Sequence, residues 1–121
     1  MGGTSLLTTE AIDQFEKMIY LPMLLTILDR DAKVFEEIPV KFNLPYLSVI
    51  TRATEIVHSD LTSTHLYFKQ HKLKLVNEGN DGVFTSYLFI IDYEQYRRRY
   101  LNVRLRNHSE ELLKVYLERQ K

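Results

Sequence analysis

The sequence predicts a small α+β domain in which helices accompany a single β-hairpin. Before residue 72, apolar residues recur at helical spacing in three stretches. The pattern then changes to alternation over 72–77 and to a run of strand-forming residues over 83–91. Between these strands lies the dense turn signal of residues 78–82, which predicts the hairpin. With 121 residues and 45% apolar content, we expect one domain over 1–121, of which residues 1–8 are a disordered leader.

The first helix is expected to begin at Thr8 or Thr9, because either hydroxyl can cap it. Pro22 lies within its apolar pattern and either kinks this helix or begins a second one. The apolar face ends at residues 29–31, and residues 32–37 are expected to form a short helical turn.

The middle of the chain predicts a short strand and two further helices. Residues 38–42 alternate and are typical of an edge strand that tolerates proline. The Asn-Leu-Pro sequence at 43–45 is a helix boundary, and a helical face follows up to about His58. Ser59 or Asp60 is expected to cap the next helix, which leads into the hairpin.

A long C-terminal helix is predicted over residues 92–120. Asp92 and Gln95 have the spacing of a capping box, and no Gly or Pro interrupts the segment. The 4-3-4-3 spacing that begins at Leu101 is typical of a helix–helix seam. The expected interface residues are Tyr96, Tyr100, Leu101, Leu105, His108, Leu112, Val115 and Tyr116.

In this order of elements the chain resembles the winged-helix superfamily, and its layout is most like the bacterial replication terminator protein family. The local match is residues 87–94, where the last strand passes into the last helix; the architectural resemblance covers about residues 10–121. The resemblance implies a winged helix-turn-helix fold with the hairpin as the wing, and a dimer formed by the C-terminal helix. Residues 70–76 contain no glycine where winged helices commonly turn, so the resemblance is taken to imply the fold and the dimer mode and not the specific role of a replication terminator.

The resemblance implies a homodimeric protein that binds double-stranded DNA, either a transcriptional regulator or a replication or chromosome-architecture factor. Short polar residues at the start of the recognition helix suit base edges and phosphates. The expected DNA contacts are Thr62, Ser63, Thr64, His65 and Lys69 in the groove, with Lys72 and Lys74 on the backbone. The alternative is a non-catalytic protein–protein interaction domain of winged-helix shape that does not bind DNA.

The charge of the chain bears on both hypotheses, DNA binding and protein binding. The 16 basic and 16 acidic residues give a net charge of zero, which disfavours strong non-specific DNA binding, although eleven of the basic residues lie in 61–121. Arg97–Arg99 with Arg104 and Arg106 form the densest basic cluster. On a helix three consecutive residues spread over most of the circumference, so this cluster is expected to be mainly a solvated face.

Other classes of function are not indicated. Without cysteine, and with four histidines that never occur four residues apart, no metal site is expected. We expect no catalytic residue and no cofactor, because the chain lacks nucleophile-elbow glycines and a Gly-rich phosphate loop. The longest apolar run, residues 19–28, is too short to span a membrane, and no signal peptide is visible, so a cytoplasmic protein is expected.

Overall fold

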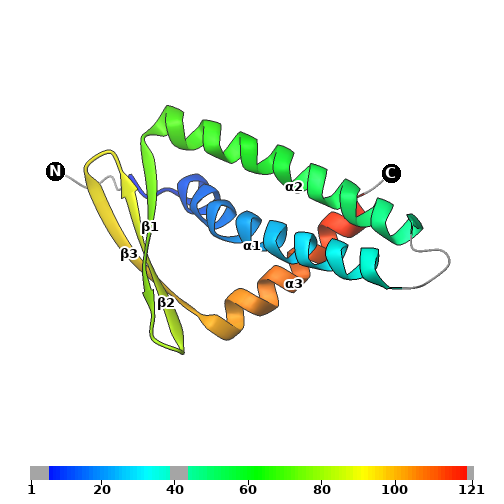
Figure 1. Cartoon of the computed structure of the whole chain (residues 1–121). Coiled ribbons are helices and arrows are strands. Elements are labelled where there is room, and N and C mark those ends of the chain that lie inside the picture. Colours follow the sequence, from blue (N-terminus) through cyan, green and yellow to red (C-terminus); the bar gives the residue numbers. More distant parts are fainter. Residues whose placement is uncertain (1–5, 39–43, 120–121) are drawn as a thin grey trace.

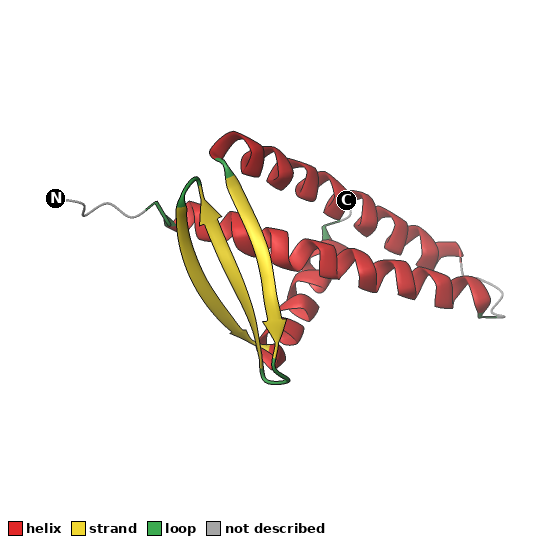
Figure 2. Ribbon diagram, turned by 60° about the vertical axis from the view of Figure 1, so that its left-hand side comes forward, coloured by secondary structure: helices red, strands yellow, loops and turns green. Residues whose placement is uncertain are grey.

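The computed structural model describes residues 6–38 and 44–119. The elements follow in the order α1 (Thr9–Glu37), α2 (Leu44–His71), β1 (Leu73–Asn80), β2 (Phe84–Ile91), β3 (Glu94–Leu101) and α3 (Asn102–Glu118). The predicted α+β class is therefore confirmed. The three helices lie on one side of the sheet, and α1 and α2 run antiparallel beside each other (Figures 1 and 2).

The first helix, α1, continues without a break past its proline. Thr8 caps it as predicted, by accepting a hydrogen bond from the Ala11 N–H at 3.1 Å. Pro22 lies inside this one helix and is exposed, so it does not begin a second helix. The predicted end at residues 29–31 is wrong, and residues 32–37 form the last turns of α1. Most of the strand predicted at 38–42 lies outside the described residues.

The second helix, α2, is also continuous, which corrects the predicted break at Ser59 or Asp60. Its buried residues, which keep helical spacing through this point, are Ile50, Ala53, Val57, Thr64 and Phe68. One apolar stripe along α1 can therefore be covered by one long partner helix, and this packing outweighs the local capping preference of serine and aspartate. The helix-turn-helix implied by the winged-helix resemblance is not formed in this segment.

The predicted hairpin is confirmed as β1 and β2, and a third strand follows it. The strands pair antiparallel in the order β1-β2-β3. The helix predicted over 92–120 begins only at Asn102, because residues 94–101 form β3 and not its first turns. Asp92 does not cap a helix; its φ of 57° places it in the tight turn between β2 and β3. Asp tolerates this left-handed conformation better than most residues.

Phe15 of α1 lies at the centre of the contact between the helices and the sheet. Its ring stacks on Phe89 of β2 with centroids 4.2 Å apart, and it meets Phe68 of α2 edge-on at 5.2 Å. Both Phe15 and Phe89 are completely buried. Aromatic pairs of this kind contribute about 0.5–1.5 kcal/mol beyond the area they bury. The first half of α1 is therefore fixed against the inner face of the sheet.

A second apolar cluster joins the other half of α1 to α2 and to the end of α3. Tyr116 of α3 belongs to this cluster, and its hydroxyl donates a 2.6 Å hydrogen bond to Asp60 of α2. Arg119 donates to the same carboxylate at 2.9 Å. Asp60 is thus part of a polar contact between two helices, which explains an aspartate in the interior of α2.

Replacement of Pro22 by alanine should stabilise the protein. Proline cannot donate the helical hydrogen bond, and in a helix interior it costs about 3 kcal/mol relative to alanine. We expect Pro22→Ala to raise the free energy of unfolding by about 1–3 kcal/mol, measured by urea denaturation with circular dichroism. Thr26→Ala, one turn further along α1 on an exposed site, is the control and should change it by only tenths of a kcal/mol. Equal effects of the two substitutions would contradict this account.

The contact at Asp60 should make stability depend on pH. Burial raises the pKa of Asp60, but the hydrogen bonds from Tyr116 and Arg119 outweigh burial and hold it below its ordinary value. A carboxylate with a lowered folded-state pKa stabilises the fold above its unfolded pKa of about 3.9, and this contribution is lost as the pH falls through the folded-state pKa.

We therefore expect Asp60→Asn to lower the free energy of unfolding by about 1 kcal/mol at pH 7, and this gap to the parent protein to shrink as the pH falls below the unfolded pKa of about 3.9. Urea denaturation across this range measures the gap. Asp29→Asn removes only an exposed pair with Lys33 and serves as control, with a small difference throughout. A gap at Asp60 that stays constant down to pH 3 would show that its charge plays no part.

Candidate interaction surface

The face of the sheet that points away from the helices is open to solvent. Side chains alternate between the two faces of a strand, and in β2 every second residue from Thr85 to Ile91 is buried against the helices. The outward residues of β2 are Phe84, Ser86, Leu88 and Ile90, and all four are only partly buried. Figure 2 shows that no helix covers this side.

This open face is more apolar than the solvent face of an antiparallel sheet usually is. Leu88 and Ile90 lie in its middle, and the register places Leu88 beside Val76 of β1. Phe84 pairs with Leu101 at the other end of the face, where Leu101 is 45% exposed. We call the five residues Val76, Phe84, Leu88, Ile90 and Leu101 the apolar strip. Such a strip within a polar margin has the composition of many protein–protein interfaces.

Charged side chains flank the apolar strip, and most of them are paired. Arg97 lies next to Leu88 and binds the Glu78 carboxylate at 2.7 Å. This hydrogen bond lowers the pKa of Glu78. Arg99 lies 3.8 Å from Asp81, and its guanidinium covers the Phe84 ring at 4.0 Å from the centroid. Exposed pairs of this kind contribute little to stability, so their charges remain accessible to a partner.

The run Arg97–Arg99 was expected to spread around a helix, and that prediction is wrong. In β3 these residues alternate, so Arg97 and Arg99 point outward and Arg98 points to the inner side. The spacing of two residues from Tyr96 to Arg98 and from Arg98 to Tyr100 is the sequence pattern that could have indicated a strand. In the structure these three side chains are less exposed than their neighbours.

The residues predicted to contact DNA do not form a helix start. Thr62, Ser63, Thr64, His65 and Lys69 lie within the continuous helix α2, where the backbone N–H groups are already hydrogen-bonded. Thr64 is only 1% exposed, so it cannot reach a groove. The hydroxyls of Thr62 and Ser63 donate to the carbonyls of residues four positions earlier, at 2.9 and 3.4 Å. His65, Lys69 and Lys72 are exposed near the end of α2, and Lys74 lies on the outer face of β1.

The residues predicted for the dimer interface mostly belong to the core of the single chain. Tyr100, Leu105 and Tyr116 are buried, and Tyr96 and Leu112 pack against the same core. His108 packs edge-on against Tyr20, with ring centroids 4.6 Å apart. Leu101 and Val115 remain exposed. The seam spacing therefore reflects packing of α3 against its own chain, and the homodimer stays a prediction.

Within residues 6–38 and 44–119, no group of three histidine or acidic side chains could hold a metal ion. No helix in that part of the chain is long and apolar enough to cross a membrane.

The comparisons with known proteins identify a family. The family model described as YhjD protein matches residues 6–121. The uncharacterized protein YhjD of Bacillus subtilis (strain 168) is 34% identical over 111 residues, which are 92% of each chain. No solved structure matches the chain. The chain therefore belongs to the YhjD protein family.

Proposed function

We propose that the chain is a non-catalytic protein-interaction domain that binds its partner on the open face of the sheet. The observation that supports this proposal is the apolar strip. Three of the four outward residues of the central strand are apolar, although no helix of the described chain covers this face. Burying such residues under a partner contributes about 25 cal/mol for each Å² of apolar surface.

The charges around the strip indicate the chemistry of the partner. Lys74, Arg97 and Arg99 point outward, and the acidic side chains beside them, Glu78 and Asp81, are held by the two arginines. Positive charge is therefore in excess at the margin of the face. A partner with apolar side chains at its centre and acidic side chains at its edge complements this pattern.

A photo-crosslinking amino acid at position 86 should capture the partner. Ser86 points outward from the middle of the face, opposite Gly79, where nothing lies within 4 Å of an added Cβ. In the organism that encodes the protein, we expect adducts from position 86 and none of the same size from position 66, which is exposed on α2. Leu88→Thr with Ile90→Thr keeps strand propensity and removes the apolar surface, so it should abolish these adducts.

Adducts that survive this double substitution would contradict the proposal, as would the absence of any adduct specific to position 86. An adduct with twice the mass of the chain would assign the face to a second copy, as in the homodimer predicted from the sequence. Light scattering of the purified protein, with and without the double substitution, then distinguishes a second copy from another protein.

Duplex DNA, the partner implied by the resemblance to winged helices, is a second candidate. The observation that favours it is the exposed row formed by His65 and Lys69, four residues apart near the end of α2, with Lys72 exposed in the turn that follows. This row contains few cations, and the net charge of the chain is zero. Few phosphate contacts can therefore form, and affinity depends on their number.

We expect no retention of a generic DNA duplex at about 150 mM salt, because the counterion release that drives such binding is small here. Fluorescence anisotropy over a range of salt concentrations measures this. If binding is tight, falls steeply with salt and is lost on Lys69→Glu with Lys72→Glu, DNA replaces the protein partner as the proposed function.

A further inference from the structure

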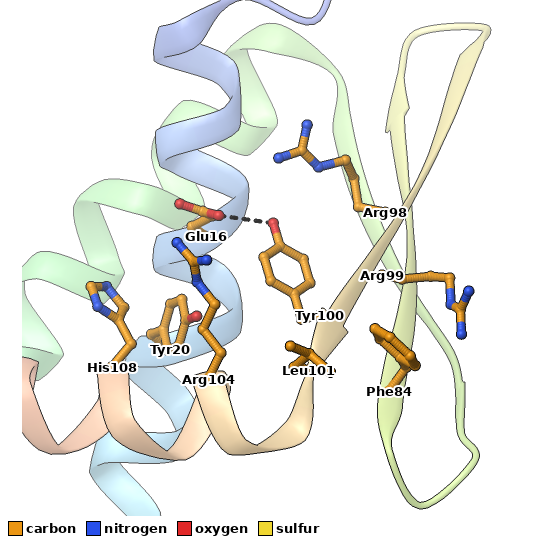
Figure 3. A pocket seen from close by; sticks show the side chains of 9 residues that line it. All are labelled: Glu16, Tyr20, Phe84, Arg98, Arg99, Tyr100, Leu101, Arg104 and His108. Atoms are coloured by element: carbon orange, nitrogen blue, oxygen red, sulfur yellow. Dashed lines mark hydrogen bonds between the residues drawn. The ribbon is translucent and has the colours of Figure 1, made fainter.

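A cleft lies between the edge strand β3 and the helices α1 and α3, and at the edge of the sheet it reaches Phe84 and Leu101, one end of the apolar strip (Figure 3). Its volume is about 430 Å³, which is within the usual range for small-ligand sites. Three pairs of side chains contribute most of its polar lining, and each pair comes from a different element. They are Glu16 and Tyr20 of α1, Arg98 and Tyr100 of β3, and Arg104 and His108 of α3.

The spacing within each pair explains why all six side chains reach the same space. Arg98 and Tyr100 are two residues apart on a strand and therefore share its inner face. Arg104 and His108 are one turn apart on α3, as are Glu16 and Tyr20 on α1. The cleft is therefore formed by the regular geometry of three packed elements and not by a loop.

A hydrogen bond crosses the floor of the cleft. The Tyr100 hydroxyl donates to Glu16 at 2.9 Å, and Figure 3 shows the guanidinium groups of Arg98 and Arg104 pointing toward this bond from β3 and α3. The ion pairs formed among the described residues include neither of these arginines. Two guanidinium groups thus face a cleft whose lining contains one carboxylate, which is already engaged by a tyrosine.

Two tyrosine hydroxyls also lie in the lining, and that of Tyr100 is already engaged by Glu16. Burial, followed by Glu16, raises the pKa of Tyr20, with Arg104 acting in the opposite direction. Burial and then the Glu16 hydrogen bond raise the pKa of Tyr100 strongly. Both hydroxyls therefore keep their protons at neutral pH. Arg104 lies in the first turn of α3, whose N-cap Leu101 provides no side-chain acceptor, so the positive end of the helix dipole adds to the potential.

We propose that this cleft binds a small ligand through a phosphate group. A phosphate monoester offers three acceptor oxygens and up to two charges, which match donors arriving from β3 and α3. A carboxylate carries only one charge and two acceptor oxygens, so it matches two guanidinium groups less well than a phosphate does. The rings of Tyr20 and Phe84 line the same cleft and can contact an organic portion of the ligand.

This inference goes beyond the proposed function, because it concerns a small ligand held between β3, α1 and α3, whereas the proposed protein partner binds the outer face of the sheet. The test is a titration of the ¹⁵N-labelled full chain with inorganic phosphate and with phenyl phosphate, followed by NMR, with sodium chloride at matched ionic strength as the blank. We expect saturable shifts centred on residues 98–108, with a Kd on the order of 1 mM or below for phenyl phosphate.

Arg104→Gln should weaken binding by about tenfold, as expected for the loss of one charge-assisted contact. Arg106→Gln is the matched control. It removes the same charge from the same helix, but residue 106 lies in a different groove and not in the cleft, so binding should be unchanged. Arg104 is exposed, so its replacement does not open the core, and the NMR spectrum of each variant reports directly whether it is folded.

Three results would overturn the proposal. They are shifts that do not saturate, shifts that sodium chloride reproduces, and equal weakening by the two arginine substitutions. A short DNA duplex in the same titration distinguishes a small ligand from a nucleic-acid backbone. Duplex binding that exceeds phenyl phosphate binding and is lost with Arg104→Gln would overturn the small-ligand assignment.

Discussion

The stack of Phe15 on Phe89 is the contact on which the rest of the arrangement depends. It brings the first half of α1 against the middle of the central strand, and Phe68 of α2 packs edge-on against the same Phe15 ring. Because this contact fills the inner face of the sheet, the outward residues of the same strand are left without cover. The second half of α1 extends beyond the sheet, and only α2 and the end of α3 remain to bury it.

The parts of the fold that could be predicted from sequence are those whose signal is local. The turn around Gly79 and Gly82 requires positive φ at both glycines, and it defined the hairpin and hence the α+β class. Ser59, Asp60 and Asp92 misled the prediction because each residue type has two uses. Asp60 binds Tyr116 from 56 positions away, and Asp92 serves a tight turn. Neither partner nor turn geometry is visible in a window of a few residues.

The candidate site was less predictable, since its residues are placed by elements far apart in the chain. Residues 94–101 were expected to be helical, which would have spread Arg97–Arg99 around the helix. In the strand that they form, these residues alternate between the two faces of the sheet. Glu16 and Tyr100 are 84 residues apart, and their hydrogen bond follows only once α1 is known to lie under β3. The predicted dimer seam had the right apolar residues, but a seam spacing alone does not distinguish packing against a second chain from packing within one chain.

Strand β3 connects the two proposed surfaces. Its period of two points Arg97 and Arg99 outward and Arg98 and Tyr100 inward, and Arg99 also reaches the cleft at the edge of the sheet. The strand is an edge strand, with β2 as its partner in the sheet, and its inner side is held to α1 by the bond between Tyr100 and Glu16. Charged side chains also protect such an edge from pairing with other chains. The arginine run thus combines protection of the edge with charge on both faces, a combination that a helix could not provide.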